Sequence, residues 1–224
     1  MAGYQRKDGW HQRAKREGFR SRAAYKLAEI QQRHRLLRRG QRVVDLGCWP
    51  GGWLQVAARA VGRDGRVVGV DLAPLDEPLG EPNVALLQAD LASPEIAGRI
   101  LDTLGGPADV VLSDAAPKLT GVRATDRARE QELLESIEAL VSELLRSGGG
   151  LLLKILDGPE AQAVERRLRA RFARAKTVKP RASRKGSAER YLLARGFRPV
   201  DPVEGAEPAR LVEGSAGGGS GEGA

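Results

Sequence analysis

The sequence is poor in the residues that form disulfides, metal sites and aromatic clusters. It contains one cysteine and two histidines, and aromatic residues make up 4% of the chain. One cysteine cannot form an intrachain disulfide, which favours a reducing compartment, and we expect a cytoplasmic protein. Cys48 is most simply a small buried residue. Because the two histidines lie far apart in the chain, we expect no bound metal.

Long apolar segments are absent as well. No apolar run approaches the roughly 20 residues that a membrane-spanning helix requires, and the N-terminal segment lacks the apolar core of a secretory signal. The length of 224 residues suits one α/β domain with a short appendage. We expect no membrane partner, and we expect a monomer.

Positive charge, in contrast, is abundant and unevenly placed. The net charge is +8 and the pI about 10.0. Residues 1–40 carry +9 and residues 166–190 carry +10, which leaves −11 on the remainder. Two basic blocks on an acidic body favour a surface that binds a polyanion such as RNA. The simpler alternative is two solvated helix faces.

One stretch, residues 43–53, organises the rest of the chain. It reads Val-Val-Asp-Leu-Gly-Cys-Trp-Pro-Gly-Gly-Trp, an apolar strand that runs into a glycine loop and then a helix. Gly47, Gly51 and Gly52 remove side chains where the backbone must turn sharply or approach a ligand. Such a loop suits a ligand with a nucleoside part and a carboxylate or phosphate. It matches neither a Walker loop nor G-x-G-x-x-G, and the simplest alternative is a tight turn of any α/β domain.

Three further apolar runs end in an acidic residue and read as strands. These acids are Asp71, Asp90 and Asp114. At the carboxyl end of the strand that follows a glycine-loop helix, the carboxylate of Asp71 can accept hydrogen bonds from both hydroxyls of a ribose. An ordinary cap or turn residue is the alternative for each acid taken singly. Repetition at the carboxyl edge of one sheet is more informative than any one of them.

A lysine interrupts another strongly apolar strand, at 151–156. A charged lysine is costly to bury, so Lys154 either lies at the end of the strand or is functional, and we favour function.

The rest of the sequence predicts these features: a basic arm over 1–20, a helix capped by Ser21, a helix over 94–104, a polar loop over 118–127, a helix over 128–146 ended by Gly148–Gly150, a helix with a basic face from Pro159 to Phe172, a basic loop over 179–190, a strand over 191–194 and a flexible Gly-rich tail.

Taken together, these motifs resemble the RrmJ/FtsJ family of ribosomal RNA 2′-O-methyltransferases over about residues 15–197. The resemblance rests on Ser21-Arg22-Ala23-Ala24-Tyr25-Lys26-Leu27, Asp45-Leu46-Gly47 with Pro50-Gly51-Gly52-Trp53, Asp71-Leu72-x-Pro74, Ser113-Asp114-x-Ala116-Pro117, Lys154, and Lys179-Pro180-x-Ala182-Ser183-Arg184 with Ser187-x-Glu189-x-Tyr191. Cys48-Trp49 departs from the small residues usual in the family, and we assign Trp49 no contact.

The resemblance implies a Rossmann-like class I fold, with a seven-stranded, mostly parallel sheet flanked by helices. With the arm over 1–20 and the tail over 198–224 expected from composition, it implies a methyltransferase domain over 21–197. It also implies S-adenosylmethionine as methyl donor and large-subunit rRNA as partner, within the ribosomal subunit and at a uridine of the A-loop. The matched catalytic positions are Lys26, Asp114, Lys154 and Glu189. The expected cofactor positions are Gly47, Gly51, Trp53, Asp71, Asp90 and Asp114.

The chemistry of ribose methylation is consistent with these residue types. A ribose hydroxyl is a weak nucleophile and needs a base within hydrogen-bond reach. A lysine accepts a proton only as the neutral amine, which burial or a second ammonium favours. We therefore expect Lys154 to be the base, with Lys26 nearby. Asp114 would hold Lys154 in place, and Glu189 would orient Lys26 or the target ribose.

Other functions remain open at this point. The same fold and surface would suit a 2′-O-methyltransferase of tRNA or of another rRNA site, or a non-catalytic RNA-binding factor in ribosome assembly. An NAD-dependent oxidoreductase is suggested only by the glycine loop and Asp71, and the missing G-x-G-x-x-G counts against it.

Overall fold

The computed structural model describes residues 9–75, 77, 79–117, 120–155, 158–183 and 189–199. Its centre is a seven-stranded sheet in the order β3-β2-β1-β4-β5-β7-β6. The strands are β1 (Arg42–Leu46), β2 (Arg66–Asp71), β3 (Val84–Gln88), β4 (Ala108–Ser113), β5 (Leu145–Ile155), β6 (Phe172–Val178) and β7 (Arg190–Phe197). The helices are α1 (Gly9–Arg16), α2 (Ala23–His34), α3 (Gly52–Val61), α4 (Ile96–Leu104), α5 (Arg123–Leu144) and α6 (Pro159–Ala170).

The sheet is mostly parallel, which confirms the predicted Rossmann-like class. Strands β1 to β5 pair in parallel, whereas β7 runs antiparallel to both β5 and β6. The strand order reverses between β1 and β4, and a crevice for a ligand is expected at such a reversal, beyond the carboxyl ends of the strands. Both the glycine loop and Asp114 follow strands that flank this point.

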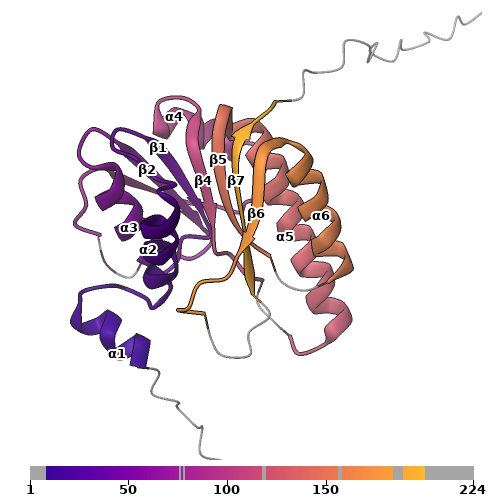
Figure 1. The fold of residues 1–224 in the computed structure, drawn as a ribbon, viewed down its shortest axis with the longest axis horizontal. Coiled ribbons are helices and arrows are strands. Elements are labelled where there is room, and N and C mark those ends of the chain that lie inside the picture. Colours follow the sequence, from indigo (N-terminus) through magenta and orange to yellow (C-terminus); the bar gives the residue numbers. More distant parts are fainter. Residues whose placement is uncertain are drawn as a thin grey trace, which may run out of the picture.

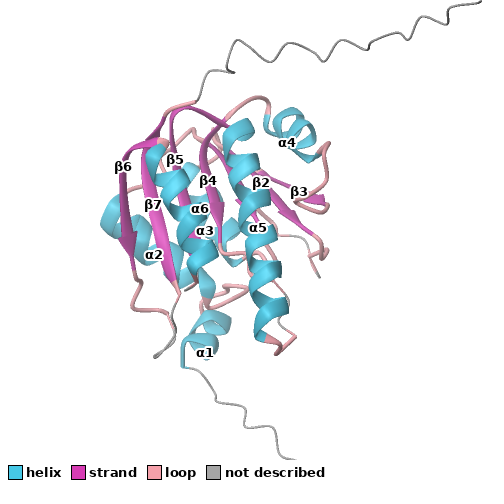
Figure 2. Ribbon diagram, turned by 90° about the vertical axis from the view of Figure 1, so that its right-hand side faces the viewer, coloured by secondary structure: helices cyan, strands magenta, loops and turns pink. Residues whose placement is uncertain are grey.

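Two helical layers cover the sheet (Figure 1). Helices α2 and α3 pack on one face through a cluster that includes Leu27, Leu54 and Leu112. Helices α4, α5 and α6 pack on the other through a cluster that includes Ile100 and Val141, and Figure 2 shows this layer in front of the strands. The inner strands are buried on both faces, as their unbroken apolar runs predict.

Several predicted boundaries are wrong. Ser21 does not cap α2, because the capping position is occupied by Arg22 and carries no side-chain hydrogen bond. The polar segment predicted as a loop up to residue 127 belongs to α5 from Arg123 onward. Gly148–Gly150 do not end that helix but lie within β5, where the chain is already extended.

Strand β3 ends at Gln88, so Asp90 follows the strand instead of closing it. Strand β6 was not expected from the residues. The sequence of β6 is Phe-Ala-Arg-Ala-Lys-Thr-Val, whose polar residues read as part of a basic segment. Pairing along β7 over seven residues makes it the edge strand of the sheet. Its cations, Arg174 and Lys176, therefore lie on a strand.

The basic arm is helical where it is described. In α1, the Trp10 ring lies 5.1 Å from the ring of Tyr25 in α2, and the Arg13 guanidinium lies over both rings. Among the described residues, no helix combines the length and apolar character needed to cross a bilayer. Residues 1–8 of the arm, Lys118 and Leu119, and the tail from residue 200 onward lie outside the described residues.

Candidate active site

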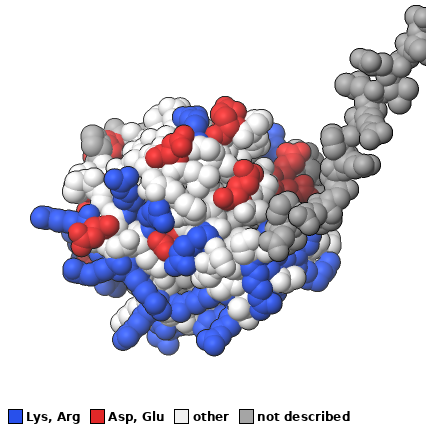
Figure 3. Space-filling model, turned by 90° about the horizontal axis from the view of Figure 1, so that it is seen from above, with Lys and Arg blue, Asp and Glu red and all other residues white. Residues whose placement is uncertain are grey.

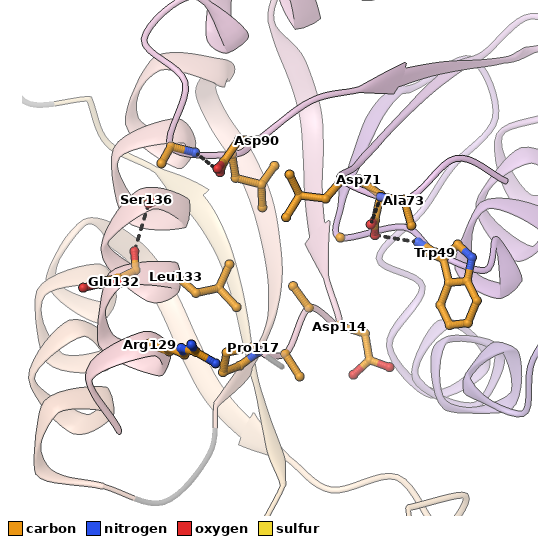
Figure 4. Close-up of a pocket in the computed structure, with 16 residues that line it drawn as sticks. Trp49, Asp71, Ala73, Asp90, Asp114, Pro117, Arg129, Glu132, Leu133 and Ser136 are labelled. Carbon is orange, nitrogen blue, oxygen red and sulfur yellow. Dashed lines mark hydrogen bonds between the residues drawn. The ribbon is translucent and has the colours of Figure 1, made fainter. Parts of the chain in front are cut away.

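A cavity of about 650 Å³ opens at the carboxyl edge of the sheet. It extends from the glycine loop and the end of β2 to the inner face of α5 (Figure 4). Its size is that of sites for small molecules and cofactors. The cavity is lined by Gly47, Trp49, Asp71, Leu72, Ala73, Asp90, Leu91, Ala92, Asp114, Ala115, Ala116, Pro117, Arg129, Glu132, Leu133 and Ser136. The three predicted strand-end acids thus border one space.

Gly47 is required by the close approach of two loops. Its φ is +76°, and a Cβ built on it would lie 2.4 Å from the Cβ of Ala115. Because no side chain fits that gap, the loop after β1 packs directly on the loop after β4. Gly47 thereby keeps Asp114, the neighbour of Ala115, close to the glycine loop.

Asp71 and Asp90 have similar local geometry. The two carboxylate oxygens of Asp71 accept hydrogen bonds from the backbone N–H groups of Trp49 and Ala73, each at 2.9 Å. Asp90 accepts one from the N–H of Ala92 at 2.9 Å. These bonds fix each carboxylate on the cavity wall. Each oxygen can accept a second hydrogen bond, because a carboxylate offers about four lone-pair sites.

Asp114 joins this cavity to a cluster of charged side chains on its other side. Lys26 Nζ lies 3.4 Å from Asp114 Oδ2 and 3.0 Å from Glu189 Oε2. Lys154 Nζ lies 3.3 Å from Asp114 Oδ1 and donates to the Asp114 carbonyl oxygen at 2.6 Å. The structure therefore brings together all four residues predicted to be catalytic, from α2, β5, the residue after β4 and the residue before β7. The side chains of both lysines are only 9% exposed.

Tyr191 is a member of this cluster that was not predicted to be functional. Its hydroxyl donates to Asp114 Oδ1 at 2.7 Å, and its ring lies 5.7 Å from Lys26 Nζ. Burial raises the pKa of the Tyr191 hydroxyl, and Asp114 and Glu189 raise it further. Tyr191 is therefore a constant donor to Asp114. Its spacing of two residues after Glu189 is the signal in the sequence that could have identified it.

Asp45 is a second residue whose setting was not foreseen. It lies in β1, is 1% exposed, and its Oδ2 has no hydrogen-bond partner. Burial raises the pKa of its carboxyl well above the ordinary value, and the charges of Asp114 and Asp71 add to this effect. Asp45 faces a small cavity of about 30 Å³ that Ser21 and Asp114 also line. The buried Oγ of Ser21 likewise has no partner there, so the small cavity holds two unsatisfied polar atoms.

Other predicted cofactor positions lie outside the lining of the large cavity. Trp53 is 3% exposed, and its Nε1 donates to the Ala23 carbonyl at 2.9 Å. Gly51, with φ +103°, precedes α3 beneath the Arg20 side chain. Their cofactor roles stay predictions. Cys48 is buried as expected, and burial raises the pKa of its thiol.

Comparison with known proteins agrees with this geometry. Residues 19–197 match the FtsJ-like methyltransferase family. The chain belongs to this family. It is therefore a methyltransferase, and the resemblance seen in the sequence is confirmed.

Curated relatives are similar over most of their length. The chain is 42% identical over 193 residues to a protein of Methanothermobacter thermautotrophicus named ribosomal RNA large subunit methyltransferase E, covering 86% of this chain and 91% of the relative. It is 47% identical over 194 residues to the protein of the same name from Rhodopseudomonas palustris, covering 85% of this chain and 81% of that protein.

Solved structures show the same fold. A crystal structure described as a ribosomal RNA methyltransferase of Plasmodium falciparum matches with a TM-score of 0.70 and 27% identity, over 81% of this chain and all of that chain. Fibrillarin of Aeropyrum pernix, solved with bound S-adenosyl-L-methionine, matches with a TM-score of 0.58 and 17% identity, over 83% of this chain and 76% of fibrillarin. At that identity the second match supports the fold alone.

S-adenosylmethionine is the cofactor of this family, and the site fits it. Asp71 and Asp90 line the cavity with carboxylate oxygens that can accept further hydrogen bonds from a ligand. The cavity, with a volume of about 650 Å³ between the glycine loop and α5, has the size of sites that hold cofactors. Among the described residues, no cluster of His, Cys, Asp and Glu side chains suits a metal ion.

Proposed function

We propose that this methyltransferase transfers a methyl group from S-adenosylmethionine to a ribose 2′-hydroxyl of large-subunit rRNA, at a uridine of the A-loop. We further propose that it acts on rRNA within the ribosomal subunit, as a cytoplasmic monomer. The rRNA substrate follows the names of its relatives. The chemistry is carried by one observation: the Asp114 carboxylate borders the donor cavity and also receives Lys26, Lys154 and Tyr191.

Lys154 is the group in this proposal that takes the proton of the 2′-hydroxyl. Its Nζ can do so only as a neutral amine. One oxygen of the Asp114 carboxylate pairs with Lys26, and the other is shared by Lys154 and the Tyr191 hydroxyl. In this proposal, Asp114 therefore holds Lys154 Nζ in position.

Lys26 and Glu189 have a positioning role in the same scheme. Lys26 Nζ bridges Glu189 and Asp114, so two carboxylates hold it in place. Glu189 and Asp114 together neutralise the charge of Lys26. This favours Lys26, over the target ribose, as the group that Glu189 orients.

The donor side of Asp114 would hold the cofactor, which supplies a methyl group on a positively charged sulfur. In this proposal, Asp71 accepts hydrogen bonds from the ribose hydroxyls of the cofactor, and Asp90 holds the nucleoside further along the wall. Lys154 would take the proton of the 2′-hydroxyl as the hydroxyl oxygen bonds to the methyl carbon, and the methyl–sulfur bond of the cofactor would break to leave a neutral thioether. No covalent enzyme intermediate is needed, so much of the rate gain comes from in-line positioning.

The most direct experiment is a map of 2′-O-methyl groups in rRNA, at nucleotide resolution, from cells with and without the gene. The proposal predicts that one A-loop uridine loses its methyl group in the deletion and regains it when the gene is restored. Restoration with a Lys154→Ala variant should not return the methyl group. Loss of a different ribose methyl would reject the A-loop target, and an unchanged map would reject the proposal for rRNA altogether.

A further inference from the structure

The two basic blocks of the sequence are not uniformly available for a ligand. On α6, Arg167 pairs with Glu138 of α5 at 2.5 Å, and Arg169 pairs with Glu165 at 2.8 Å. The Glu165 carboxylate also receives Arg190 at 3.1 Å. Carboxylates therefore neutralise much of the block between 166 and 190 on this side of the sheet.

The other side of β6 has a different character. Arg174 and Lys176 are exposed on β6, and Arg174 is the register partner of Arg195 on β7. Within the described parts of the chain, no carboxylate lies within ion-pair distance of these three side chains. We call Arg174, Lys176 and Arg195 the cation ledge.

The cation ledge lies beside the C-terminal end of α2. Lys176 Nζ is 3.2 Å from His34 Nδ1, and Arg195 donates to the His34 carbonyl oxygen. Helix α2 packs over the neighbouring strands through residues such as Leu27 and Ile30, and among the described residues no helix packs extensively on this face of β6. In Figure 3, where the lower side of the view is the β6 edge of the sheet, Lys and Arg side chains gather along that side and around its left corner.

The electrostatic surroundings of His34 report the same excess of positive charge. Burial lowers the pKa of the His34 ring, and Lys176, Arg195 and Arg33 lower it further. Within the described residues, Lys176 and Arg195 have no carboxylate close enough to pair with, so an anion that binds beside them reduces their mutual repulsion. The ledge is thus matched to an anionic ligand.

The register of the sheet relates the ledge to the active site. Val178 of β6, Tyr191 of β7 and Lys154 of β5 lie in one row across three strands. Lys176 is two residues from this row and Arg174 is four, which corresponds to about 7 Å and 13 Å along the strand. These spacings are comparable to the distances between successive phosphates of one RNA strand.

We infer that the face of β6 beside α2 binds the phosphate backbone of the RNA strand that flanks the target nucleotide, with successive phosphates on the cation ledge. The inference rests on the proposed function, because it takes RNA as the substrate. It adds the path by which that RNA leaves Lys154, along α2 toward His34. An RNA backbone fits better than an acidic peptide, because the cations follow a straight strand with a regular repeat.

The test compares two double variants with the same change in net charge. Arg174→Gln with Lys176→Gln removes two cations of the ledge, whereas Arg99→Gln with Arg166→Gln removes two exposed cations on α4 and α6, across the sheet. Binding of a fluorescein-labelled oligouridylate of about 20 nucleotides is measured by anisotropy over a salt series. This probe is independent of the methylation target.

The slope of log K against log salt should become shallower by about 1.4 in the ledge variant, because each lost contact to a single strand removes about 0.7. It should stay near the wild-type value in the control variant. A wild-type slope in the ledge variant, an equal loss in both variants, or a wild-type protein that does not bind the oligouridylate would overturn the inference.

A second measurement separates this inference from the proposed function. In methyl transfer to isolated large ribosomal subunits, the ledge variant should show a raised KM for the subunits and an unchanged kcat. Calorimetric titration should give the same S-adenosylmethionine affinity for all three proteins, which verifies folding. If the wild-type protein methylates no rRNA, the proposed function fails, while the salt slopes still decide whether the ledge binds an RNA backbone.

Discussion

The two sides of Asp114 are built on different principles. On the donor side, Asp71 and Asp90 stand separately on a cavity wall, each held by backbone N–H groups. On the acceptor side, Lys26 pairs with both Glu189 and Asp114, and Lys154 pairs with Asp114, all with little exposure. The donor side thus presents free acceptor capacity to a neutral or cationic ligand, whereas the acceptor side keeps its charges within the protein.

This difference indicates a division of labour. A wall of fixed carboxylates is suited to binding, since its hydrogen bonds are available before the ligand arrives. A buried group of ion-paired side chains is suited to proton transfer, because a small change in the hydrogen bonds between its members alters which atom holds the proton. Asp114 is the residue that both sides share. Substitutions at residues other than Asp114 should therefore impair one side and leave the other intact.

The largest effect is expected from Asp114→Asn, which breaks both sides at once. The amide has no charge to pair with Lys26 and Lys154, and both remain buried. Removing one partner of a buried ion pair typically costs about 3–5 kcal/mol. We expect such a loss of stability in urea denaturation and single-turnover methyl transfer slower by at least about 10³-fold. Near-normal stability would mean that the lysines do not depend on Asp114.

Asp71→Ala should break the donor side alone. Loss of hydrogen bonds to a carboxylate costs about 1–3 kcal/mol, so the Kd for S-adenosylmethionine should rise by about 5- to 150-fold in calorimetric titration. The rate of transfer at saturating cofactor should stay close to wild type. The corresponding Asp90→Ala variant provides a comparison on the same wall. An unchanged Kd in a folded Asp71 variant would remove this residue from the donor site.

Asp45→Asn tests the comparison further, because Asp45 lines the small cavity that Asp114 also borders. Burial raises the pKa of the Asp45 carboxyl, so the folded protein holds this proton more tightly than the unfolded chain. The stability this provides is complete below about pH 4, the unfolded pKa, and is lost as pH rises through the folded pKa.

Asparagine cannot ionise, so the variant should gain stability relative to wild type as pH rises from about 4 to 8. We expect a gain of roughly 1–3 kcal/mol, the scale of an unsatisfied buried polar group. The measurement is urea denaturation at several pH values without cofactor. A difference between the two proteins that does not change with pH would show that Asp45 does not titrate in this way.

The smallest effect is expected outside both sides, on the N-terminal arm. Lys15 and Arg16 are exposed in the last turn of α1. Replacing both by glutamine should flatten the salt dependence of RNA binding by at most about 1.4 in slope. Cofactor affinity and single-turnover rate should not change. A full wild-type slope would show that this part of the arm does not contact phosphate.

Local patterns were sufficient to predict the inner strands and the positions of the acids. Val43, Val67 and Val111 lie in unbroken apolar runs that fit only buried strands, and the acids follow those strands on one edge. The glycine loop predicted the close approach that Gly47 makes to Ala115. These features depend on neighbours in the sequence.

Features that depend on distant partners were missed. Strand β6 has exposed cations and is stabilised by pairing with β7, so its own residues resemble a loop. Gly149 lies within β5, although its sequence resembles a helix end, and only glycine fits there because a Cβ would lie 2.9 Å from the Arg146 carbonyl oxygen. The pairing of Arg167 with Glu138, 29 residues away, could not be read from charge counts. Those counts therefore overstated the basic surface on the α6 side.

Single-turnover methyl transfer to rRNA by Lys154→Arg, with cofactor affinity measured on the same protein, tests the central claim most directly. Arginine keeps the positive charge and can still pair with Asp114, but its guanidinium cannot accept a proton. The account predicts that transfer falls about as far as in Lys154→Ala, by at least about 10²-fold, while the Kd for S-adenosylmethionine stays near the wild-type value. An arginine variant with near-normal turnover would show that position 154 needs only a positive charge, and would contradict the assignment of Lys154 as the base.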